Sequence, residues 1–420
     1  MNNRRKLSTT KPFLFWVRWW IGLPTIVFFL TALAAPAAAE PADWAATVEA
    51  ARGQTVDWFM YGGFPAANAY VNGFVAPALK EKYGVTLRQV PVRDIAEVMS
   101  RLLVERQAGK TEGGEADLMW INGENFRTAK GNGLLFGPYA DRLPNIRYVD
   151  LAKPSVKNDF GEPVEGMESP WGGAQVVFIH DTARTPEPPK TMGDFIRWIK
   201  DHPGRFTYPA PPDFTGSVFV RHVFYHVAGD VVGWQGDFDE EKFAAAAEQT
   251  YAALRELKPF LWREGQTYPE SPVRLSQLFA DGEIDFSFSY HPAEASKRIQ
   301  DGLYPETVRT FVFEEGTIAN THFVAIPFNA GDPEGAMVAA NFLLSPEAQL
   351  ENADSRVWGD LPAIDAGRLE PEWQAKFQAP PRGEATLPDA VLQAHRLPEP
   401  PSEILIRLEQ GWQEKVLKAR

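Results

Sequence analysis

Short apolar segments alternate with segments of helical periodicity through the first third of this 420-residue chain. Residues 55–60, 85–92 and 116–121 are rich in apolar and β-branched residues and have the length of strands. Residues 65–82 and 94–107, which lie between them, carry apolar residues at helical spacing. This alternation is typical of a parallel sheet with helices on both faces. The sequence therefore predicts an α/β fold with ligand-binding loops at the carboxyl ends of the strands.

A similar alternation returns after residue 168. Residues 168–181 form an apolar run, Thr191 is placed to cap a helix, and 284–289 alternates strictly. Residues 214–227 and 240–257 have helical patterns. Because single hydrophobic cores stop growing beyond roughly 250–300 residues, we expect two α/β lobes.

The segment from Phe313 to Leu350 has a tight order of loop, strand, turn and helix. Residues 314–320 are polar and hold a glycine, which predicts a loop, and 322–328 read as a short buried strand. Asp332 is placed to cap the next helix, with Pro333 at the first helical position.

This segment resembles the late part of the extracellular solute-binding proteins of bacterial ABC importers, through GTIANTHFVAIPFNA and then EGAMVAANFLLSPEAQ. The resemblance is closest to the branch that includes thiamine, iron, polyamine and sulfate binders. Other features follow in the family's order along nearly all of the chain after residue 39. These are an aromatic–glycine loop after a strand, a segment that crosses between lobes, a proline-rich loop before a helix, and a strand that ends in an aromatic residue.

The resemblance implies the periplasmic-binding-protein type II architecture, with mixed sheets flanked by helices and a ligand cleft between two lobes. On this basis lobe 1 comprises residues 40–172 with 318–352 returning to it. Lobe 2 comprises residues 173–317, with 353–420 packing on it. The expected protein is a monomer without a cofactor. It binds a small solute, delivers it to permease and ATPase subunits at the membrane, and catalyses no reaction.

The first 39 residues have the pattern of a signal peptide. Basic residues before position 19 precede an uncharged run that ends in Ala37-Ala38-Ala39. We expect cleavage after Ala39 and a periplasmic protein, with a retained membrane anchor as the alternative. The Arg4-Arg5 pair leaves both the twin-arginine and the Sec export routes open.

Composition narrows the classes of partner and of site. The chain has no cysteine, which excludes disulfides, thiolate metal sites and a cysteine nucleophile. Its formal net charge is −13, and residues 1–39 hold basic residues but no acidic ones, so the remainder is more acidic still. An acidic surface repels nucleic acid and favours a cationic or neutral ligand over an anion.

Signals for catalysis are few. Gly109-Lys110-Thr111 resembles the end of a phosphate loop, but Val104 stands where the first glycine belongs. His222 and His226 have the spacing of two metal ligands on one helix face, without the glutamate of zinc proteases. Glu314-Glu315 is an acidic pair on a loop. A secreted hydrolase or metal-dependent enzyme that uses these histidines and acidic loops is the alternative function.

Candidate ligand-binding residues lie at predicted strand ends, crossings and helix starts. Rings that can stack on a flat ligand or hold a cation are Tyr61, Trp120, Trp171, Phe214, Tyr290 and His291. Backbone N–H groups that can bind an anion come from Gly62, Gly63, Thr215, Gly216 and Ser217. Polar side chains come from Asn122, Glu124, Glu315, Thr317 and Asn320.

The expected ligand is a small organic cation such as thiamine or a polyamine, and an anion held at helix starts is the second expectation. Iron binders of the resembled branch use paired tyrosines, and this chain has no Tyr-Tyr pair, which argues against ferric iron. No metal ligand set is expected.

Overall fold

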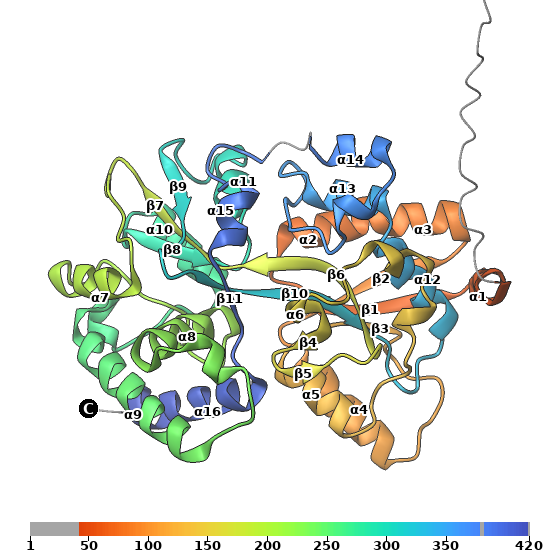
Figure 1. Ribbon diagram of the computed structural model, residues 1–420, viewed down its shortest axis with the longest axis horizontal. Coiled ribbons are helices and arrows are strands. Elements are labelled where there is room, and N and C mark those ends of the chain that lie inside the picture. The colour runs from red at the N-terminus through yellow and green to blue at the C-terminus, as the bar shows by residue number, and fades with distance from the viewer. Residues whose placement is uncertain (1–41, 379–381, 419–420) are drawn as a thin grey trace, which may run out of the picture. The chain divides into compact units, whose positions relative to one another are not determined.

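The computed structural model describes residues 42–378 and 382–418 (Figure 1). The predicted signal peptide, residues 1–39, lies outside these described residues. The part of the chain from Glu40 onward forms one compact unit. None of the helices that the structure describes is long and apolar enough to cross a membrane.

The first half of the chain builds a parallel sheet, as predicted. β1 (Thr55–Tyr61) lies between β2 (Thr86–Val92) and β3 (Leu118–Ile121) and pairs in parallel with both. The helices of this half are α1 (Ala42–Ala51), α2 (Pro65–Tyr70), α3 (Ala76–Tyr83), α4 (Ala96–Gln107), α5 (Glu124–Gly131) and α6 (Pro154–Lys157). A short hairpin of β4 (Asn158–Asp159) and β5 (Glu162–Pro163) follows.

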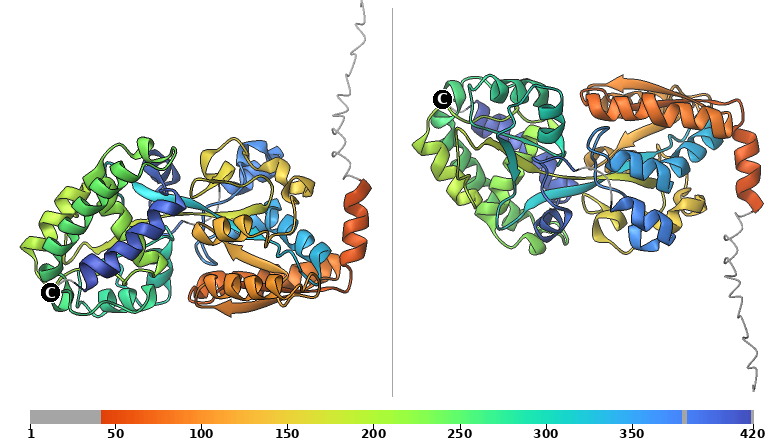
Figure 2. Two further views of the ribbon diagram at one scale, coloured as in Figure 1. Left: turned by 90° about the horizontal axis from the view of Figure 1, so that it is seen from below. Right: turned by 90° about the horizontal axis from the view of Figure 1, so that it is seen from above.

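Two long buried strands run through the middle of the molecule (Figure 1). β6 (Glu168–Gln175) and β10 (Thr317–Ala325) pair antiparallel, and every residue of both strands is buried. β10 also pairs antiparallel with β3 and parallel with β11 (Arg396–Pro398). The two views in Figure 2 show groups of helices on either side of these central strands.

The start of β10 differs from the prediction. Residues 314–320 are predicted as a loop, but the strand begins at Thr317. Gly316 makes the turn, with φ of +103°, and Thr317 then pairs with Arg396 of β11. Two neighbouring strands thus extend β10 toward its start, and the sequence gives no local sign of either pairing. The prediction for residues 317–320 is therefore wrong.

The second half of the chain has a smaller, antiparallel sheet. β7 (Val177–Asp181) lies between β8 (Phe286–Ser289) and β9 (Val308–Phe311). Its helices are α7 (Met192–Asp201), α8 (Phe214–Ala228), α9 (Glu240–Leu257), α10 (Pro272–Ala280) and α11 (Glu294–Gln300). Residues 331–418 add α12 (Pro333–Leu343), α13 (Pro346–Ala353), α14 (Pro371–Phe377), α15 (Asp389–Ala394) and α16 (Ser402–Trp412).

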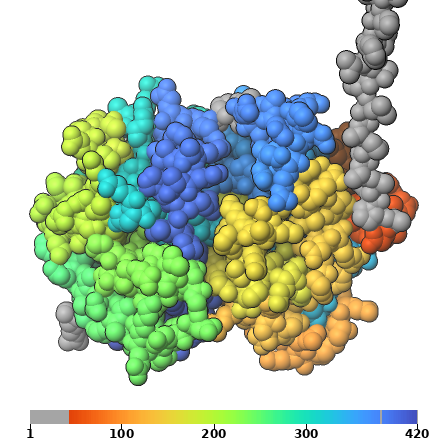
Figure 3. All heavy atoms as spheres, in the orientation of Figure 1, coloured from red at the N-terminus to blue at the C-terminus, as the bar shows by residue number. Residues whose placement is uncertain are grey.

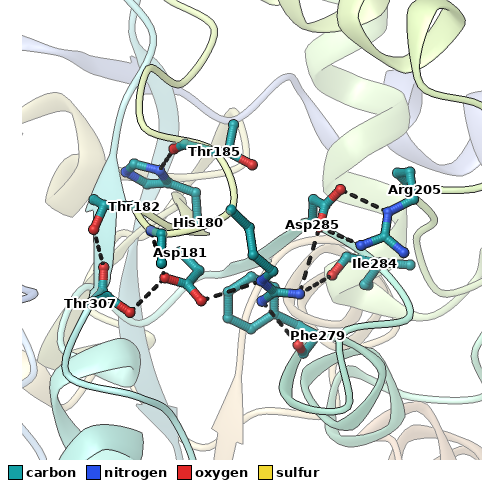
Figure 4. Close-up of polar contacts among 11 residues, drawn as sticks. His180, Asp181, Thr182, Thr185, Arg205, Phe279, Ile284, Asp285 and Thr307 are labelled. Carbon is teal, nitrogen blue, oxygen red and sulfur yellow. Dashed lines mark hydrogen bonds and ion pairs between the residues drawn. The ribbon is translucent and has the colours of Figure 1, made fainter.

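Polar contacts fix the end of β7 against its neighbours (Figure 4). Asp181 accepts hydrogen bonds from Thr307 Oγ1 at 2.6 Å and from Arg184 Nε at 3.3 Å. Arg184 Nη1 also lies 3.6 Å from Asp285 Oδ1, and Arg205 Nε donates to Asp285 Oδ2 at 2.7 Å. This network joins β7, β9 and the approach to β8, and it gives Asp181 a structural role.

Buried side chains form cores in two regions. One core takes residues from Val176 to Ile318 and, from the end of the chain, residues between 385 and 416. The other comprises two neighbouring clusters, with residues from 44 to 171 and from 324 to 369. The chain therefore passes between the cores along β6 and β10, and again between residues 369 and 385.

Of the helix caps that the sequence predicts, the one at Thr191 is confirmed and the one at Asp332 is not. Thr191 Oγ1 accepts from Asp194 N at 3.0 Å, and Ser345 Oγ accepts from Ala348 N at 3.2 Å, so both residues cap helices. Asp332 stands at the N-cap position of α12, but its side chain makes no cap hydrogen bond. Its carboxylate instead accepts from Thr55 N at 3.2 Å, at the start of β1.

Gln349, at the end of the SPEAQ motif, ties three segments together. Its Nε2 donates to the carbonyl oxygens of Trp171 and Leu343, both at 2.7 Å, and its Oε1 accepts from Ala363 N at 2.6 Å. The side chain is fully buried. These bonds join β6, the end of α12 and the segment after α13.

We expect Gln349→Ala to lower the free energy of unfolding by roughly 2–4 kcal/mol, because it leaves buried backbone groups without partners. Urea denaturation measures the change. Gln410→Ala, at an exposed position on α16, is the matched control and should change stability by less than about 0.5 kcal/mol. An equal effect of the two substitutions would contradict this role.

Candidate functional site

A cavity of about 190 Å³ lies between the two cores and is lined by residues from both. Figure 3 shows the surfaces of the two halves meeting along a seam down the middle of one face. The lining residues are Tyr61, Phe64, Arg93, Asp94, Ile95, Trp120, Asn122, Glu124, Asn125, Ala174, Pro212, Asp213, Phe214, Thr215, Pro272, Tyr290, His291, Asn320, His322, Trp358 and Asp360.

The first half contributes residues at strand ends. Tyr61 is the last residue of β1, Trp120 lies near the end of β3, and Asn122 and Glu124 follow β3 at the start of α5. The carboxyl ends of neighbouring parallel strands meet at one edge of a sheet, so these side chains come together. Asp159 holds the turn between them, because its Oδ2 accepts from Gly123 N at 2.8 Å.

Glu124 is a carboxylic acid in a poorly solvated place. Its Oε1 accepts from Asn125 Nδ2 at 3.3 Å, and its Oε2 has no hydrogen-bond partner among the described residues. Burial raises the pKa of Glu124 to about 7, because the charged form loses hydration. The cavity therefore holds a carboxyl group that titrates near neutral pH.

The second half contributes the start of α8. Asp213 caps this helix, since its Oδ1 accepts from Gly216 N at 2.8 Å. Burial raises the pKa of Asp213 to about 6, although hydrogen bonds from backbone N–H groups oppose the change. A Cβ atom on Gly216 would lie 1.9 Å from Pro209 O, so only glycine lets α8 start this close to the preceding loop.

Tyr290 joins the cavity wall to a buried ion pair. Its ring stacks on Phe214, with ring centroids 5.0 Å apart, and its hydroxyl donates to Glu399 Oε1 at 2.6 Å. Glu399 also pairs with Arg221 and accepts from Asn320 Nδ2 at 3.1 Å. The wall at Tyr290 thus depends on α8, β10 and the segment after β11.

One end of the cavity is an aromatic enclosure around Asp360. His322 stacks on Trp358, with ring centroids 6.0 Å apart and planes 15° apart. It also makes an edge-to-face contact with Trp120, with ring centroids 4.9 Å apart. Phe64 lies 5.2 Å from the ring of His291. The two imidazoles lie next to the carboxylate of Asp360, which is 1% exposed, with His291 Nδ1 3.9 Å from Oδ1 and His322 Nε2 3.5 Å from Oδ2.

The structure brings together more than half of the candidates from the sequence. Cavity-lining candidates are Tyr61, Trp120, Asn122, Glu124, Phe214, Thr215, Tyr290, His291 and Asn320. Candidates outside the lining are Gly62, Gly63, Trp171, Gly216, Ser217, Glu315 and Thr317. Which of them contact a ligand stays a prediction.

The glycine candidates outside the lining have packing roles. A Cβ on Gly62 would lie 2.6 Å from Pro91 Cβ, and one on Gly63 would lie 2.3 Å from Tyr61 Oη. Gly62 N donates to Val92 O at 2.9 Å, so it is already bonded. Both glycines therefore allow Tyr61 and β2 to pack closely against this loop. The sequence predicts anion binding for them instead.

The remaining candidates outside the lining make contacts within the protein. Trp171 is fully buried behind the cavity wall, 4.9 Å from the Trp120 ring, and Ser217 is buried in α8. Glu315 Oε1 accepts from Met192 N at 2.6 Å. Thr317 Oγ1 accepts from Gln175 Nε2 at 3.3 Å on the neighbouring strand.

His222 and His226 do not form a pair at the cavity. His222 is buried, with Nδ1 donating to Val218 O at 2.8 Å and Nε2 accepting from Ile318 N at 3.1 Å. Burial lowers the pKa of His222 to about 4, so the ring is neutral and both nitrogens are engaged. His226 is exposed. In the described part of the chain, no group of three or more His, Cys, Asp or Glu residues could hold a metal ion.

Sequence reasoning missed several lining residues. Phe64, Ile95, Ala174, Pro212 and Pro272 have no polar signature, and Arg93 and Asp94 read as a helix start. Asp213, His322, Trp358 and Asp360 were also missed. A signal existed only for Asp213, which directly precedes the helix that starts at Phe214.

Comparison with known proteins gives the family. The model of the bacterial extracellular solute-binding protein family matches residues 74–381. Protein YnjB of Escherichia coli (strain K12) is 40% identical over 375 residues, which cover 89% of this chain and 94% of YnjB.

Two solved structures are similar in fold. The periplasmic thiamin binding protein matches with a TM-score of 0.62 and 18% identity, covering 87% of this chain and 96% of that one. The spermidine/putrescine ABC transporter substrate-binding protein PotD from Streptococcus pneumoniae strain Canada MDR_19A matches with a TM-score of 0.58 and 14% identity, covering 85% and 99%. Both confirm the type II periplasmic-binding-protein fold. This chain belongs to the bacterial extracellular solute-binding protein family and is the solute-binding component of an ABC transporter.

Proposed function

We propose that this protein captures a small organic cation, such as thiamine or a polyamine, and delivers it to the permease of its ABC importer. The observation that carries the proposal is the composition of the cavity wall. Carboxylates and aromatic rings dominate it. Two proteins of similar fold also support it, because their names refer to thiamin and to spermidine and putrescine, which are organic cations.

Charge at the cavity favours a cation. Four acidic side chains line it, Asp94, Glu124, Asp213 and Asp360, against one basic side chain, Arg93. Arg93 and Asp94 are both exposed, so the charged side chains with less exposure, Glu124, Asp213 and Asp360, are all acidic. Carboxylates that lose hydration without a cationic partner cost free energy, and a bound cation restores the missing partner. A cation therefore binds with electrostatic gain where an anion meets repulsion.

Aromatic faces add to this preference. The rings in the lining are Tyr61, Phe64, Trp120, Phe214, Tyr290 and Trp358, with the imidazoles of His291 and His322. Such faces attract a desolvated cation by roughly 0.5–2 kcal/mol each and also stack on flat rings. They suit an organic cation better than a small hydrated ion.

The second candidate, an anion held at helix starts, has less support. The start of α8 already binds the Asp213 carboxylate, and α5 begins with Glu124. The starts of α5 and α8 therefore present negative charge of their own. An anion would have to displace or neutralise these groups before it reached the backbone N–H donors.

The two cores support a closing mechanism. We propose lobe 1 in residues 40–172 and 318–352, and lobe 2 in residues 173–317. The sequence assigns the tail, residues 353–420, to lobe 2. We propose instead that 358–369, which are buried with the first core, belong with lobe 1 and that 385–416, which are buried with the second core, belong with lobe 2. A ligand that touches both lobes shifts the equilibrium toward the closed form by its differential affinity.

The location follows from the family and the leader. We propose a periplasmic monomer, exported with residues 1–39 as a cleaved signal peptide. The family binds solutes outside the cytoplasm for permease and ATPase partners. The alternative, a hydrolase that uses His222 and His226, is disfavoured because backbone groups occupy both ring nitrogens of His222.

A ligand panel tests the proposal. Thiamine, putrescine and spermidine are compared with sulfate and phosphate by thermal shift, followed by calorimetry. At least one cation should raise the melting temperature in a concentration-dependent way, through binding to the folded state. Stabilisation by the anions alone, or turnover of a substrate by the purified protein, would rule out the proposed function.

The pH dependence of binding follows from the raised pKa values. Glu124 and Asp213 ionise in the folded protein near pH values of about 7 and about 6, above their ordinary values of 4.5 and 3.8. At these two groups the ligand-free folded state then binds more protons than the unfolded state, so their contribution to stability falls as pH rises from about 5 to 8. Cation affinity should rise over the same range by about tenfold, because the ionised form attracts the cation.

Calorimetry and urea denaturation at several pH values measure both trends. Glu124→Gln should flatten both curves, and Glu256→Gln, at an exposed ion pair with Lys200, should leave them unchanged. Cation affinity that falls as pH rises would contradict the assignment of these carboxyl groups.

Two substitutions of Tyr290 distinguish the contribution of its ring from that of its hydroxyl group. Tyr290→Phe keeps the ring on Phe214 and loses the bond to Glu399, whereas Tyr290→Leu loses both. We expect the leucine variant to weaken binding of the cation that the panel identifies by about fivefold or more. The phenylalanine variant should stay within about threefold of wild type. Equal affinity of both variants and wild type would remove Tyr290 from the binding surface.

A further inference from the structure

We propose that Asp360, between His291 and His322, forms a subsite that binds one N–H-donating cationic group of the ligand, such as an ammonium or an amidinium. This inference rests on the proposed function and names the ligand chemistry at one end of the cavity. All three side chains line the cavity. They are among the most buried polar groups there, with exposed fractions of 1% for Asp360, 3% for His291 and 9% for His322.

Asp360 lines the cavity, and the hydrogen-bonding capacity of its carboxylate is unused within the described chain. Among the described residues, neither of its carboxylate oxygens has a hydrogen-bond partner. His291 Nδ1 lies 3.9 Å from Oδ1, and His322 Nε2 lies 3.5 Å from Oδ2, both longer than a normal hydrogen bond. A buried carboxylate without donors is costly, and such groups are rare unless a ligand, water or ion completes them.

The tautomer of His291 explains why this histidine does not donate a hydrogen bond to Asp360. His291 Nε2 lies 2.7 Å from Trp358 O, and a carbonyl oxygen can only accept, so Nε2 carries the proton. Burial lowers the pKa of His291, which keeps the ring neutral and leaves Nδ1 as an acceptor. Two acceptors, Nδ1 and Asp360 Oδ1, therefore face each other. A donor placed between them, such as a ligand N–H group, would bond to both.

The backbone makes room for this carboxylate. A Cβ atom on Gly172 of β6 would lie 2.3 Å from Asp360 Oδ2 and 3.1 Å from His322 Cδ2. Glycine at this position of a fully buried strand lets Asp360 lie against β6. Asp360 N and Gly359 N both bond to Asn352 O, at 3.0 and 2.9 Å, which fixes the turn that carries the carboxylate.

The subsite draws on both halves of the molecule. His291 follows β8, whose phenylalanines belong to the second core. Trp358, two residues before Asp360, belongs to the first core, and His322 lies on β10 between the cores. A cationic group bound to Asp360 and His291 would thus contact both halves, as a ligand that drives lobe closure must.

A metal ion is the competing occupant of a carboxylate with two histidines. The described residues contain no group of three or more His, Cys, Asp or Glu side chains that could hold a metal ion. The aromatic rings of Trp120 and Trp358 around the site also suit an organic cation better than a metal with bound water. We therefore assign the subsite to an organic N–H donor.

Calorimetry on four proteins tests the assignment with the panel cation that binds wild type most tightly. Asp360→Asn removes the charge at constant shape and should weaken binding by about 10- to 100-fold. Gly172→Ala should also weaken it, because the added Cβ displaces the carboxylate. Asp301→Asn, at an exposed ion pair with Lys297, is the matched control and should stay within about twofold of wild type.

A ligand analogue identifies the N–H groups as the recognised chemistry. Full N-methylation of an amine, as in the bis-trimethylammonium analogue of putrescine, keeps the charge and removes every N–H donor. Wild type should bind putrescine more tightly than this analogue, and Asp360→Asn should remove most of the difference. The ligand-free Asp360→Asn protein should melt no lower than wild type, since it loses an unpaired buried charge.

The outcomes separate this inference from the proposed function. Suppose that Tyr290→Leu weakens cation binding and that Asp360→Asn leaves it within threefold of wild type. This result would overturn the subsite and leave the proposed function standing. If wild type binds zinc, and Asp360→Asn abolishes zinc binding but leaves cation binding intact, the site is a metal site and not the proposed subsite. Absence of binding of every panel cation to wild type would end both.

Discussion

The antiparallel pairing of β6 with β10 is the constraint on which the rest of the structure depends. All residues of both strands are buried, and the strands run between the two cores. Together they bring Ala174, Asn320 and His322 to the cavity, and they place Gly172 against Asp360. Gln349 fixes the same strand from the other side through the Trp171 carbonyl. A shift of one residue in this pairing would turn these side chains away from the cavity.

The cavity concentrates groups that are unfavourable in the absence of a ligand. Burial raises the pKa of Glu124 to about 7 and of Asp213 to about 6, and Asp360 has no hydrogen-bond donor among the described residues. Outside the cavity, Arg221 and Glu399 form a buried ion pair, whereas Glu168 on β6 is a buried carboxyl group without a hydrogen-bond partner among the described residues. A concentration of such groups in one cavity is typical of a binding site, where local free energy is given up for recognition and the remainder of the fold compensates.

The sequence predicts the fold, and it predicts the side of the site that the first sheet forms better than the side that the late segment forms. Strand ends are recognisable from apolar runs, so Tyr61, Trp120 and Glu124 could be assigned to a common edge of the sheet. Trp358 and Asp360 arrive from a late segment whose position depends on long-range packing, and no local pattern marks them. The sequence predicts a loop at Thr317, because no local pattern signals the pairing with β11, nearly eighty positions later in the chain, that extends this strand. The sequence predicts that the N–H group of Gly216 binds an anionic ligand, but in the structure it donates to Asp213.

The central claim is that buried carboxylates with raised pKa values bind an organic cation. Calorimetry at a pH of about 6.5, in two buffers of different ionisation enthalpy, counts the protons exchanged on binding. Since a cation favours ionised carboxylates, the account predicts net release of protons when thiamine or a polyamine binds. Net proton uptake, or binding without any proton exchange, would contradict it.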